Sequence, residues 1–169
     1  IINDNKFIES YSLAKLKSFN PNIFNCCDKH RMYIEIIQNT NKDIKEGAVF
    51  NETGIIGQVV NNKSFYEVML LTDTKSSIPL TNSKGDFYCN ASGSGASDYI
   101  TCSYSQLVWL DNHELGEKFF SSGLGGIYPK GIEIGNLESI KIVDTSTTLL
   151  TIKLISNPLH SNLFGVIKL

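Results

Sequence analysis

The sequence predicts an all-β fold, either a barrel or a sandwich. Apolar and polar residues alternate in short runs along almost the whole chain, and β-branched and aromatic residues dominate these runs. Clusters of Asn, Asp, Ser and Gly separate the runs at intervals of roughly 8–12 residues. Regular spacing of such short strands is typical of small β-barrels and β-sandwiches.

The expected strands follow one another from the first third of the chain to its end. Alternating patterns predict strands at residues 32–38, 54–60, 65–71, 77–80, 86–89, 99–104, 132–134, 140–143, 148–155 and 163–169. Turn-forming residues separate neighbouring strands at 61–63, 82–85, 93–95 and 144–146. Helix signals are weak, but residues 4–16 carry apolar side chains at three- to four-residue spacing and predict a short N-terminal helix.

Length and charge indicate a globular chain and disfavour a nucleic-acid-binding function. The chain has 169 residues, which favours one large domain or two small ones. Its 15 basic and 17 acidic residues give a net charge of −2, and this disfavours nucleic acid as a partner. No run of 18 apolar residues is present, so no membrane-spanning segment is predicted within the chain. The chain starts at Ile1 rather than Met, so we expect any signal or membrane anchor upstream of it.

Four cysteines are present, and none belongs to a recognisable metal-binding motif. Cys26 and Cys27 are adjacent, whereas Cys89 and Cys102 are 13 residues apart. No Cys or His spacing matches a zinc site, so no metal is predicted. A disulfide between Cys89 and Cys102 across a hairpin and two buried free thiols both agree with the sequence.

The histidines suggest an enzymatic alternative. His30 has Asp28 nearby in sequence, and His113 has Asp111 and Glu114 nearby, so a serine-hydrolase-like enzyme is one interpretation. However, the chain contains no Gly-x-Ser-x-Gly elbow, and the pattern after His113 lacks the second histidine of an HExxH zinc motif. We therefore predict no catalytic residue, no cofactor and no metal ligand.

Two further groups of residues have structural interpretations. The glycines at 123–126 follow no βαβ pattern, and Tyr128 stands where a GxGxxG motif needs its last glycine. We interpret these glycines as positions that need a positive φ or a close backbone approach. The aromatic residues of the expected hairpin exceed what a small barrel can bury, which indicates a protein-binding surface. They are Phe87, Tyr88, Tyr99 and Tyr104.

The stretch SSGLGGIYPKGIEIG at residues 121–135 resembles the signature of the MreC family of bacterial rod-shape-determining proteins. Three further segments resemble this family in family order: NKDIKEGAV at 41–49, NETGIIGQVV at 51–60, and VMLLTD at 68–73 followed by IPL at 78–80. Asn41 replaces a usual glycine, and the four cysteines lie outside the family pattern. The resemblance implies a structural role for Ser122, Gly123, Leu124, Gly125, Gly126, Pro129, Gly131 and Gly135.

The resemblance implies a specific fold, namely two small six-stranded β-barrels with the second inserted into the first. It assigns residues 1–50 with 128–169 to the first, discontinuous barrel and residues 51–127 to the second. The predicted helix would then remain at the N-terminus. The glycine motif is expected where the chain returns from the second barrel to the first. We expect Gly125 or Gly126 to have a positive φ or to lie against a barrel wall.

The resemblance also implies a function without catalysis. The chain is expected to act as a scaffold of the cell-elongation machinery that organises peptidoglycan synthesis. Its implied partners are a class B penicillin-binding transpeptidase, MreD and further copies of itself. It is expected on the periplasmic side of the inner membrane, with a membrane anchor upstream of Ile1. The four hairpin aromatic residues are the expected partner-binding face. A serine-hydrolase-like double-barrel enzyme and a peptidoglycan-binding module are the alternatives.

Overall fold

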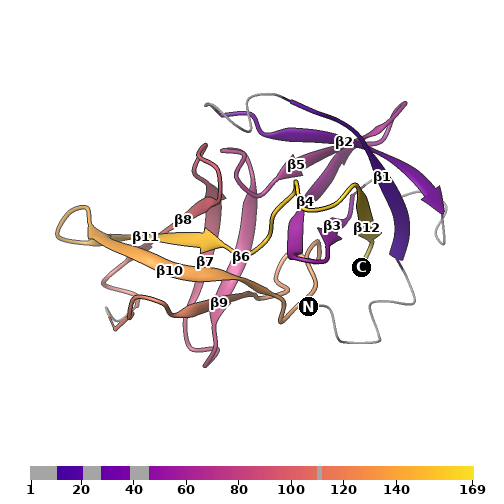
Figure 1. The fold of residues 1–169 in the computed structure, drawn as a ribbon. Helices are drawn as coiled ribbons and strands as arrows, with labels where there is room; N and C mark the ends of the chain where they lie inside the picture. Colours follow the sequence, from indigo (N-terminus) through magenta and orange to yellow (C-terminus); the bar gives the residue numbers. More distant parts are fainter. Residues whose placement is uncertain (1–10, 21–27, 39–45, 110–111) are drawn as a thin grey trace.

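The computed structural model shows an all-β protein made of two closed six-stranded barrels (Figure 1), as expected. The structure describes residues 11–20, 28–38, 46–109 and 112–169. Every strand pairing in these ranges is antiparallel. Within the same ranges, no helix is long and apolar enough to cross a membrane.

The first barrel combines the N-terminal strands with the last strand of the chain. Its strands are β1 (Tyr11–Phe19), β2 (Arg31–Gln38), β3 (Ala48–Asn51), β4 (Gly54–Asn61), β5 (Tyr66–Leu70) and β12 (Leu163–Ile167). They close in the order β1-β12-β3-β4-β5-β2. Alternate side chains along these strands point inward and form an apolar core that includes Ala14, Met32, Ile34, Phe164 and Val166.

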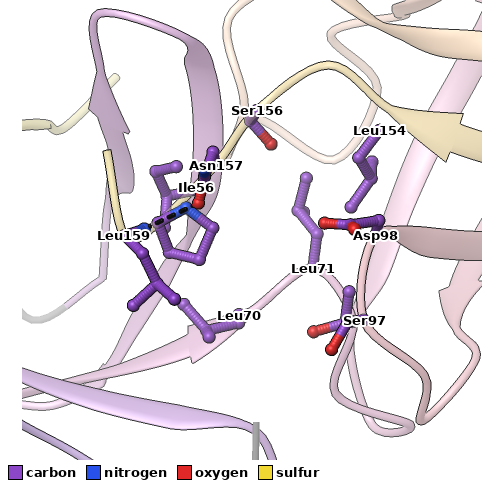
Figure 2. A pocket seen from close by; sticks show the side chains of 11 residues that line it. Ile56, Leu70, Leu71, Ser97, Asp98, Leu154, Ser156, Asn157 and Leu159 are labelled. Atoms are coloured by element: carbon purple, nitrogen blue, oxygen red, sulfur yellow. Dashed lines mark hydrogen bonds between the residues drawn. The ribbon is translucent and has the colours of Figure 1, made fainter. Parts of the chain in front are cut away.

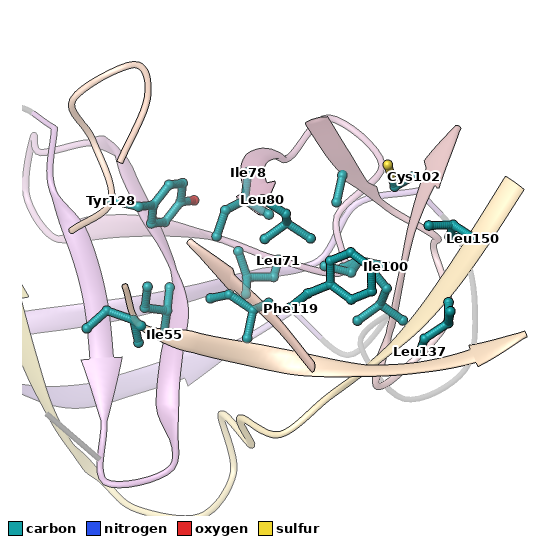
Figure 3. Close-up of a cluster of buried hydrophobic side chains, with 14 of the residues drawn as sticks. Ile55, Leu71, Ile78, Leu80, Ile100, Cys102, Phe119, Tyr128, Leu137 and Leu150 are labelled. Atoms are coloured by element: carbon teal, nitrogen blue, oxygen red, sulfur yellow. The ribbon is translucent and has the colours of Figure 1, made fainter. Parts of the chain in front are cut away.

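The second barrel is formed by one continuous stretch of chain. Its strands are β6 (Ser77–Asn82), β7 (Tyr88–Gly93), β8 (Tyr99–Ser105), β9 (Lys118–Ser121), β10 (Glu133–Ile142) and β11 (Thr147–Leu154). They close in the order β10-β11-β8-β7-β6-β9. Figure 3 shows its core, in which Leu80, Ile100 and Phe119 are buried. Ile55 of β4 belongs to the same cluster, so the apolar core continues into the junction with the first barrel.

The predicted barrel boundaries, 1–50 with 128–169 and 51–127, are wrong. β4 and β5 complete the first barrel, and β10 and β11 belong to the second, which is therefore inserted between β5 and β12. Local hairpins explain the difference, because β4 pairs with β3 across a turn that sets Asn51 opposite Gly54, and β10 pairs with β9. The alternating pattern of a strand does not specify its neighbours, so periodicity alone does not locate such a boundary.

The short N-terminal helix predicted at 4–16 is wrong for residues 11–16, and the rest of that range lies outside the described residues. Residues 11–16 belong to β1, which pairs with β12 on one side and with β2 on the other. Ser12 and Ala14 are both buried, at the two-residue spacing of a strand. Strand pairing on both sides overrides the weak helical spacing of the apolar residues.

A disulfide joins Cys89 of β7 to Cys102 of β8. These strands are neighbours in the second barrel, and Cys102 lies in its core. Of the two alternatives that the sequence left open, the structure therefore shows the bridge. A cross-link of this kind restricts the unfolded chain and so favours the folded hairpin. Cys26 and Cys27 lie outside the described residues.

Candidate functional site

The glycine-rich motif forms the connection between β9 and β10, two strands of the second barrel. The expectation that it carries the chain back to the first barrel is wrong, since residues 155–162 between β11 and β12 make that return. The expectation about its conformation is confirmed. Gly125 and Gly126 have φ values of 81° and 72°, which lie in the left-handed region that glycine adopts most easily.

The side chain of Ser121 holds the two ends of this glycine loop together. Ser121 Oγ accepts a hydrogen bond from Ile132 N at 3.0 Å and donates one to Pro129 O. Ser122 N donates to Pro79 O at 3.0 Å, which ties the loop to β6. Sequence reasoning identified Ser122 and Pro129 but missed Ser121, whose signal was its place at the start of the family-like stretch. The loop is therefore closed by hydrogen bonds that its flanking residues supply.

The remaining motif residues occupy different environments. Leu124 is exposed at the tip of the loop. Gly123 and Gly131 also have positive φ values. Gly135 lies in β10, where a Cβ would collide with the backbone oxygen of Lys153 in β11. The motif thus combines turn positions with one position of close strand approach, and these are roles in folding rather than in chemistry.

Gly125→Val is expected to lower the free energy of unfolding by more than about 2 kcal/mol. A Cβ at residue 125 meets no atom within 4 Å, so the cost comes from the backbone conformation and not from a clash. Gly125→Asn is the matched control, because Asn tolerates the left-handed region. Urea unfolding of the three proteins measures the effect. A loss below about 0.5 kcal/mol for the valine variant contradicts the assignment.

Tyr128 attaches the glycine loop to the first barrel. Its hydroxyl donates a hydrogen bond to Gln58 Oε1 of β4 at 3.1 Å, and its ring is buried. Burial raises the pKa of Tyr128 well above its ordinary value, so the hydroxyl remains protonated and able to donate. The loop therefore contacts both barrels and helps to fix their relative position.

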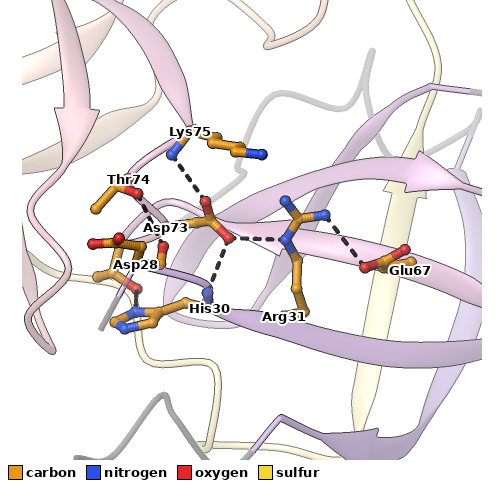
Figure 4. Close-up of polar contacts among 8 residues, drawn as sticks. Asp28, His30, Arg31, Glu67, Asp73, Thr74 and Lys75 are labelled. Carbon is orange, nitrogen blue, oxygen red and sulfur yellow. Dashed lines mark hydrogen bonds and ion pairs between the residues drawn. The ribbon is translucent and has the colours of Figure 1, made fainter. Parts of the chain in front are cut away.

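A polar cluster centred on Asp73 holds the segment that leads from β5 to β6 (Figure 4). Asp73 Oδ2 accepts hydrogen bonds from Arg31 Nε at 2.8 Å and from His30 N at 2.9 Å, and Oδ1 accepts one from Lys75 N at 2.9 Å. Arg31 also pairs with Glu67 at 3.3 Å. Burial alone would raise the pKa of Asp73, but these donors lower the pKa below its ordinary value. The cluster thus keeps a buried carboxylate ionised and fully hydrogen-bonded.

Neither histidine is arranged as a catalytic base beside a serine. His30 is buried, and its Nδ1 lies 2.7 Å from Thr72 Oγ1. His113 Nδ1 lies 2.8 Å from Glu117 Oε2, and its ring packs edge-on against Phe87. The buried Nε2 atoms of both rings have no hydrogen-bond partner within the part of the chain that the structure describes. A Ser–His–Asp arrangement needs contacts on both ring nitrogens, and these rings do not make them.

The carboxylates that the sequence places near the histidines are not their partners. Asp28 is exposed, and its backbone oxygen accepts hydrogen bonds from Thr74. Glu114 is also exposed, and Asp111 lies outside the described residues. Over the described ranges, no group of three or more His, Cys, Asp or Glu side chains is placed to hold a metal ion.

The aromatic residues predicted as a partner-binding face do not share one surface. Phe87 and Tyr104 are 3% and 6% exposed, and their rings pack edge-on with centroids 5.1 Å apart. The prediction that these two residues form an exposed face is wrong. The segment between β8 and β9 explains the burial, because Trp109 and His113 pack their rings against Phe87.

The other two predicted aromatic residues lie at opposite ends of the second barrel. β8 begins at Tyr99 beside the junction, and Tyr99 is partly exposed. β7 begins at Tyr88 and runs toward Gly93, which abuts the backbone of Asp73 at the junction. Tyr88 is therefore at the end away from the first barrel, where it is 41% exposed and lies beside the ring of Trp109.

An apolar surface that the sequence reasoning missed lies at this same end. The β10–β11 hairpin projects away from the first barrel (Figure 1), and its Ile142 is 66% exposed. The turn after β8 lies beside the hairpin, since it donates a backbone hydrogen bond to Ser146 O at 2.9 Å. Leu107 in that turn is 87% exposed. We define the distal face as the exposed apolar residues Tyr88, Leu107, Val108, Ile140, Ile142 and Val143.

The fold and these surfaces define a class of protein, a double β-barrel with an exposed apolar end. Within the described residues it has no assembled Ser–His–Asp site and no metal cluster. The family model described as "Rod shape-determining protein MreC, barrel core" matches residues 23–168. The chain belongs to the MreC family.

Curated relatives carry the same family name. The cell shape-determining protein MreC of Haemophilus influenzae is 32% identical over 112 residues, which cover 63% of this chain and 31% of that protein. The Escherichia coli protein of the same name is 27% identical over 117 residues, which cover 68% of this chain and 31% of that protein. The match therefore spans about a third of the length of these relatives.

Solved structures share the fold. MreC from Pseudomonas aeruginosa has a TM-score of 0.74 at 21% identity, covering 93% of this chain and 98% of that chain. A complex between penicillin-binding protein 2 and MreC from Helicobacter pylori contains a chain with a TM-score of 0.68 at 18% identity. That match covers 94% of this chain and 97% of the other. At these identities the likeness establishes the double-barrel architecture.

Proposed function

We propose that this chain is a non-enzymatic scaffold of the cell-elongation machinery that binds a class B penicillin-binding transpeptidase on the periplasmic side of the inner membrane. Membership of the MreC family supports this role, as does the complex of Helicobacter pylori MreC with penicillin-binding protein 2. By holding the transpeptidase, the scaffold organises peptidoglycan synthesis and so cell shape. Contact with MreD and self-association belong to the same proposal.

The distal face is the surface that carries this proposal. Its residues are large and apolar. Five of them lie on the hairpin and the adjoining turn, and Tyr88 of β7 lies beside the ring of Trp109 just after that turn. Contiguous exposed apolar surface on a folded domain marks an interaction site, and an aromatic anchor such as Tyr88 is typical of interface centres. Neither a serine-hydrolase site nor a site for peptidoglycan is favoured by a specific contact of the described residues.

The outer edge of β10 supports protein binding at the distal face. β9 pairs with β10 only as far as Asn136, and beyond Leu137 no described strand lies against that edge. Val143 N donates to Thr147 O, so alternation directs the backbone groups of Ile140 and Ile142 away from β11. An unpaired edge of this kind accepts an extended segment of another protein through main-chain hydrogen bonds.

Ile142→Asp is expected to weaken binding to the periplasmic part of the cognate transpeptidase by at least about tenfold, because it places a charge in an apolar interface. Calorimetry with this chain measures the affinity. Ile37→Asp is the matched control, since Ile37 is 49% exposed on β2 of the first barrel. Equal affinities of the wild type and Ile142→Asp would remove the distal face from the proposal, as would an equal loss in the control.

A further inference from the structure

We infer that the pocket between the two barrels binds an alkylammonium group of the kind carried by a lysine side chain. The pocket has a volume of about 250 Å³. Both connections between the barrels line it, namely residues 71–72 on the way out of the first barrel and residues 156–159 on the way back (Figure 2). The turn before β8 completes the wall from the second barrel through Ser97 and Asp98.

The walls of the pocket suit an aliphatic chain. Its lining includes Ile56 and Leu70 from the first barrel, Leu71 from the outgoing connection, Leu154 from the second barrel and Leu159 from the return. Figure 2 shows that these side chains surround the space from several directions. Burial of methylene groups against such walls is favourable and roughly proportional to the apolar area covered.

Asp98 adds a single charge to this apolar pocket. Figure 2 shows its carboxylate on the side of Leu71. Among the described residues, no Lys or Arg lines the pocket, and none makes a hydrogen bond or ion pair with the carboxylate. Asp98 is an exposed residue at the mouth of the pocket, so its carboxylate is accessible to a cationic head while the apolar walls cover an aliphatic stem.

The backbone conformation of Asp98 is fixed by the turn before β8. Asp98 is the one non-glycine residue with a positive φ, 71°, in the part of the chain that the structure describes. Its backbone oxygen accepts a hydrogen bond from Leu154 N at 2.8 Å, which extends the pairing of β8 with β11. Asn tolerates this conformation at least as well as Asp. The backbone therefore does not require a carboxylate at this position.

The chemistry of the pocket selects an alkylammonium over other cations. A divalent metal ion needs several oxygen ligands, whereas Asp98 is the sole acidic residue among the described residues that line the pocket. An ammonium on an aliphatic stem satisfies both features at once, since the stem covers apolar surface and the head meets the carboxylate. Two sources carry this group, a lysine of a partner protein and the free amine of a cell-wall peptide.

Titration with n-butylammonium tests the site directly. In methyl-detected NMR of this chain, the probe is expected to shift the resonances of Leu70, Leu71 and Leu154 with millimolar affinity. Asp98→Asn keeps the backbone conformation and removes the charge, so it is expected to weaken binding by about threefold to fivefold. The neutral isostere n-butanol is expected to bind the wild type as weakly as butylammonium binds the variant.

Three results overturn the inference: shifts scattered outside the pocket, equal affinity in the wild type and Asp98→Asn, or equal binding of butylammonium and butanol.

Competition then distinguishes the sources of the amine. Displacement of butylammonium by the periplasmic part of the transpeptidase, lost in Asp98→Asn, assigns the group to a partner lysine. Displacement by an amine-bearing cell-wall peptide, but not by its N-acetylated form, assigns it to the cell wall. Ile142→Asp leaves this pocket unchanged, so the outcome is independent of the distal face.

Discussion

Gly93→Ala is expected to lower the free energy of unfolding by more than about 4 kcal/mol, which is a large part of the stability of a typical domain. A Cβ on Gly93 would overlap the backbone of Thr72 and Asp73. These atoms belong to the connection that leads into the second barrel, and the hydrogen bonds of the Asp73 cluster fix that connection. No rotation of a side chain relieves the overlap, so either the strand or the connection must move.

A control separates this overlap from the general effect of replacing glycine. Gly85 has a φ of 71°, and a Cβ there meets nothing within 4 Å. Gly85→Ala is therefore expected to cost only about 1 kcal/mol, through backbone strain alone. Thermal and urea unfolding of both variants measure the difference. If Gly93→Ala loses no more stability than Gly85→Ala, the close approach of β7 to the connection is not rigid.

Asp73→Ala is expected to lower the free energy of unfolding by about 3–5 kcal/mol at neutral pH. The change leaves the guanidinium of Arg31, whose side chain is only 11% exposed, with Glu67 as its remaining partner. It also removes the acceptor of the N–H groups of His30 and Lys75. Asp144→Ala is the control, because Asp144 caps an exposed turn with the same kind of backbone hydrogen bond. A similar loss in both variants, measured by urea unfolding, contradicts the special role of the buried cluster.

The same carboxylate predicts how stability depends on pH. The pKa of Asp73 is lower in the folded protein than its ordinary value of 3.8. The ionised cluster therefore stabilises the folded state fully above the ordinary value, and this contribution is lost as pH falls through the lowered pKa. The difference in stability between the wild type and Asp73→Ala is expected to be constant above about pH 5 and to shrink below about pH 4. Urea unfolding across this range measures it, and a pH-independent difference contradicts the assignment.

Strands were predictable from the sequence, whereas barrel membership was not. The alternation around residues 54–60 and 99–104 is a local property, and the structure has strands there as β4 and β8. Which barrel β4 joins depends on its pairing with β3 and β5, and the residues of β4 do not encode that choice. The helix expected at 4–16 was wrong for the same reason. Pairing with β2 and β12 makes residues 11–16 a strand, and the sequence of residues 11–16 does not show that pairing.

In the candidate sites, too, features set by local sequence were predictable and features set by tertiary contacts were not. The positive φ of Gly125 was predictable, since crowded glycines beside a proline indicate a tight turn. The burial of Phe87 was not, because it depends on Trp109 and His113 from a segment more than twenty residues later. The pocket beside Asp98 was equally hidden, because its walls come from both barrels and from both connections between them. Such surfaces arise from tertiary packing rather than from a local pattern.

The insertion of the second barrel between β5 and β12 affects the order in which the two barrels can fold. β12 lies between β1 and β3, so the first barrel closes only with the last of the twelve described strands to be synthesised. The second barrel needs only residues 77–154, and its strands are complete before β12 is made. Until then the edges of β1 and β3 that β12 will cover are unpaired and can pair with wrong strands during folding. β12 therefore closes a barrel whose other five strands all precede the second barrel in the chain.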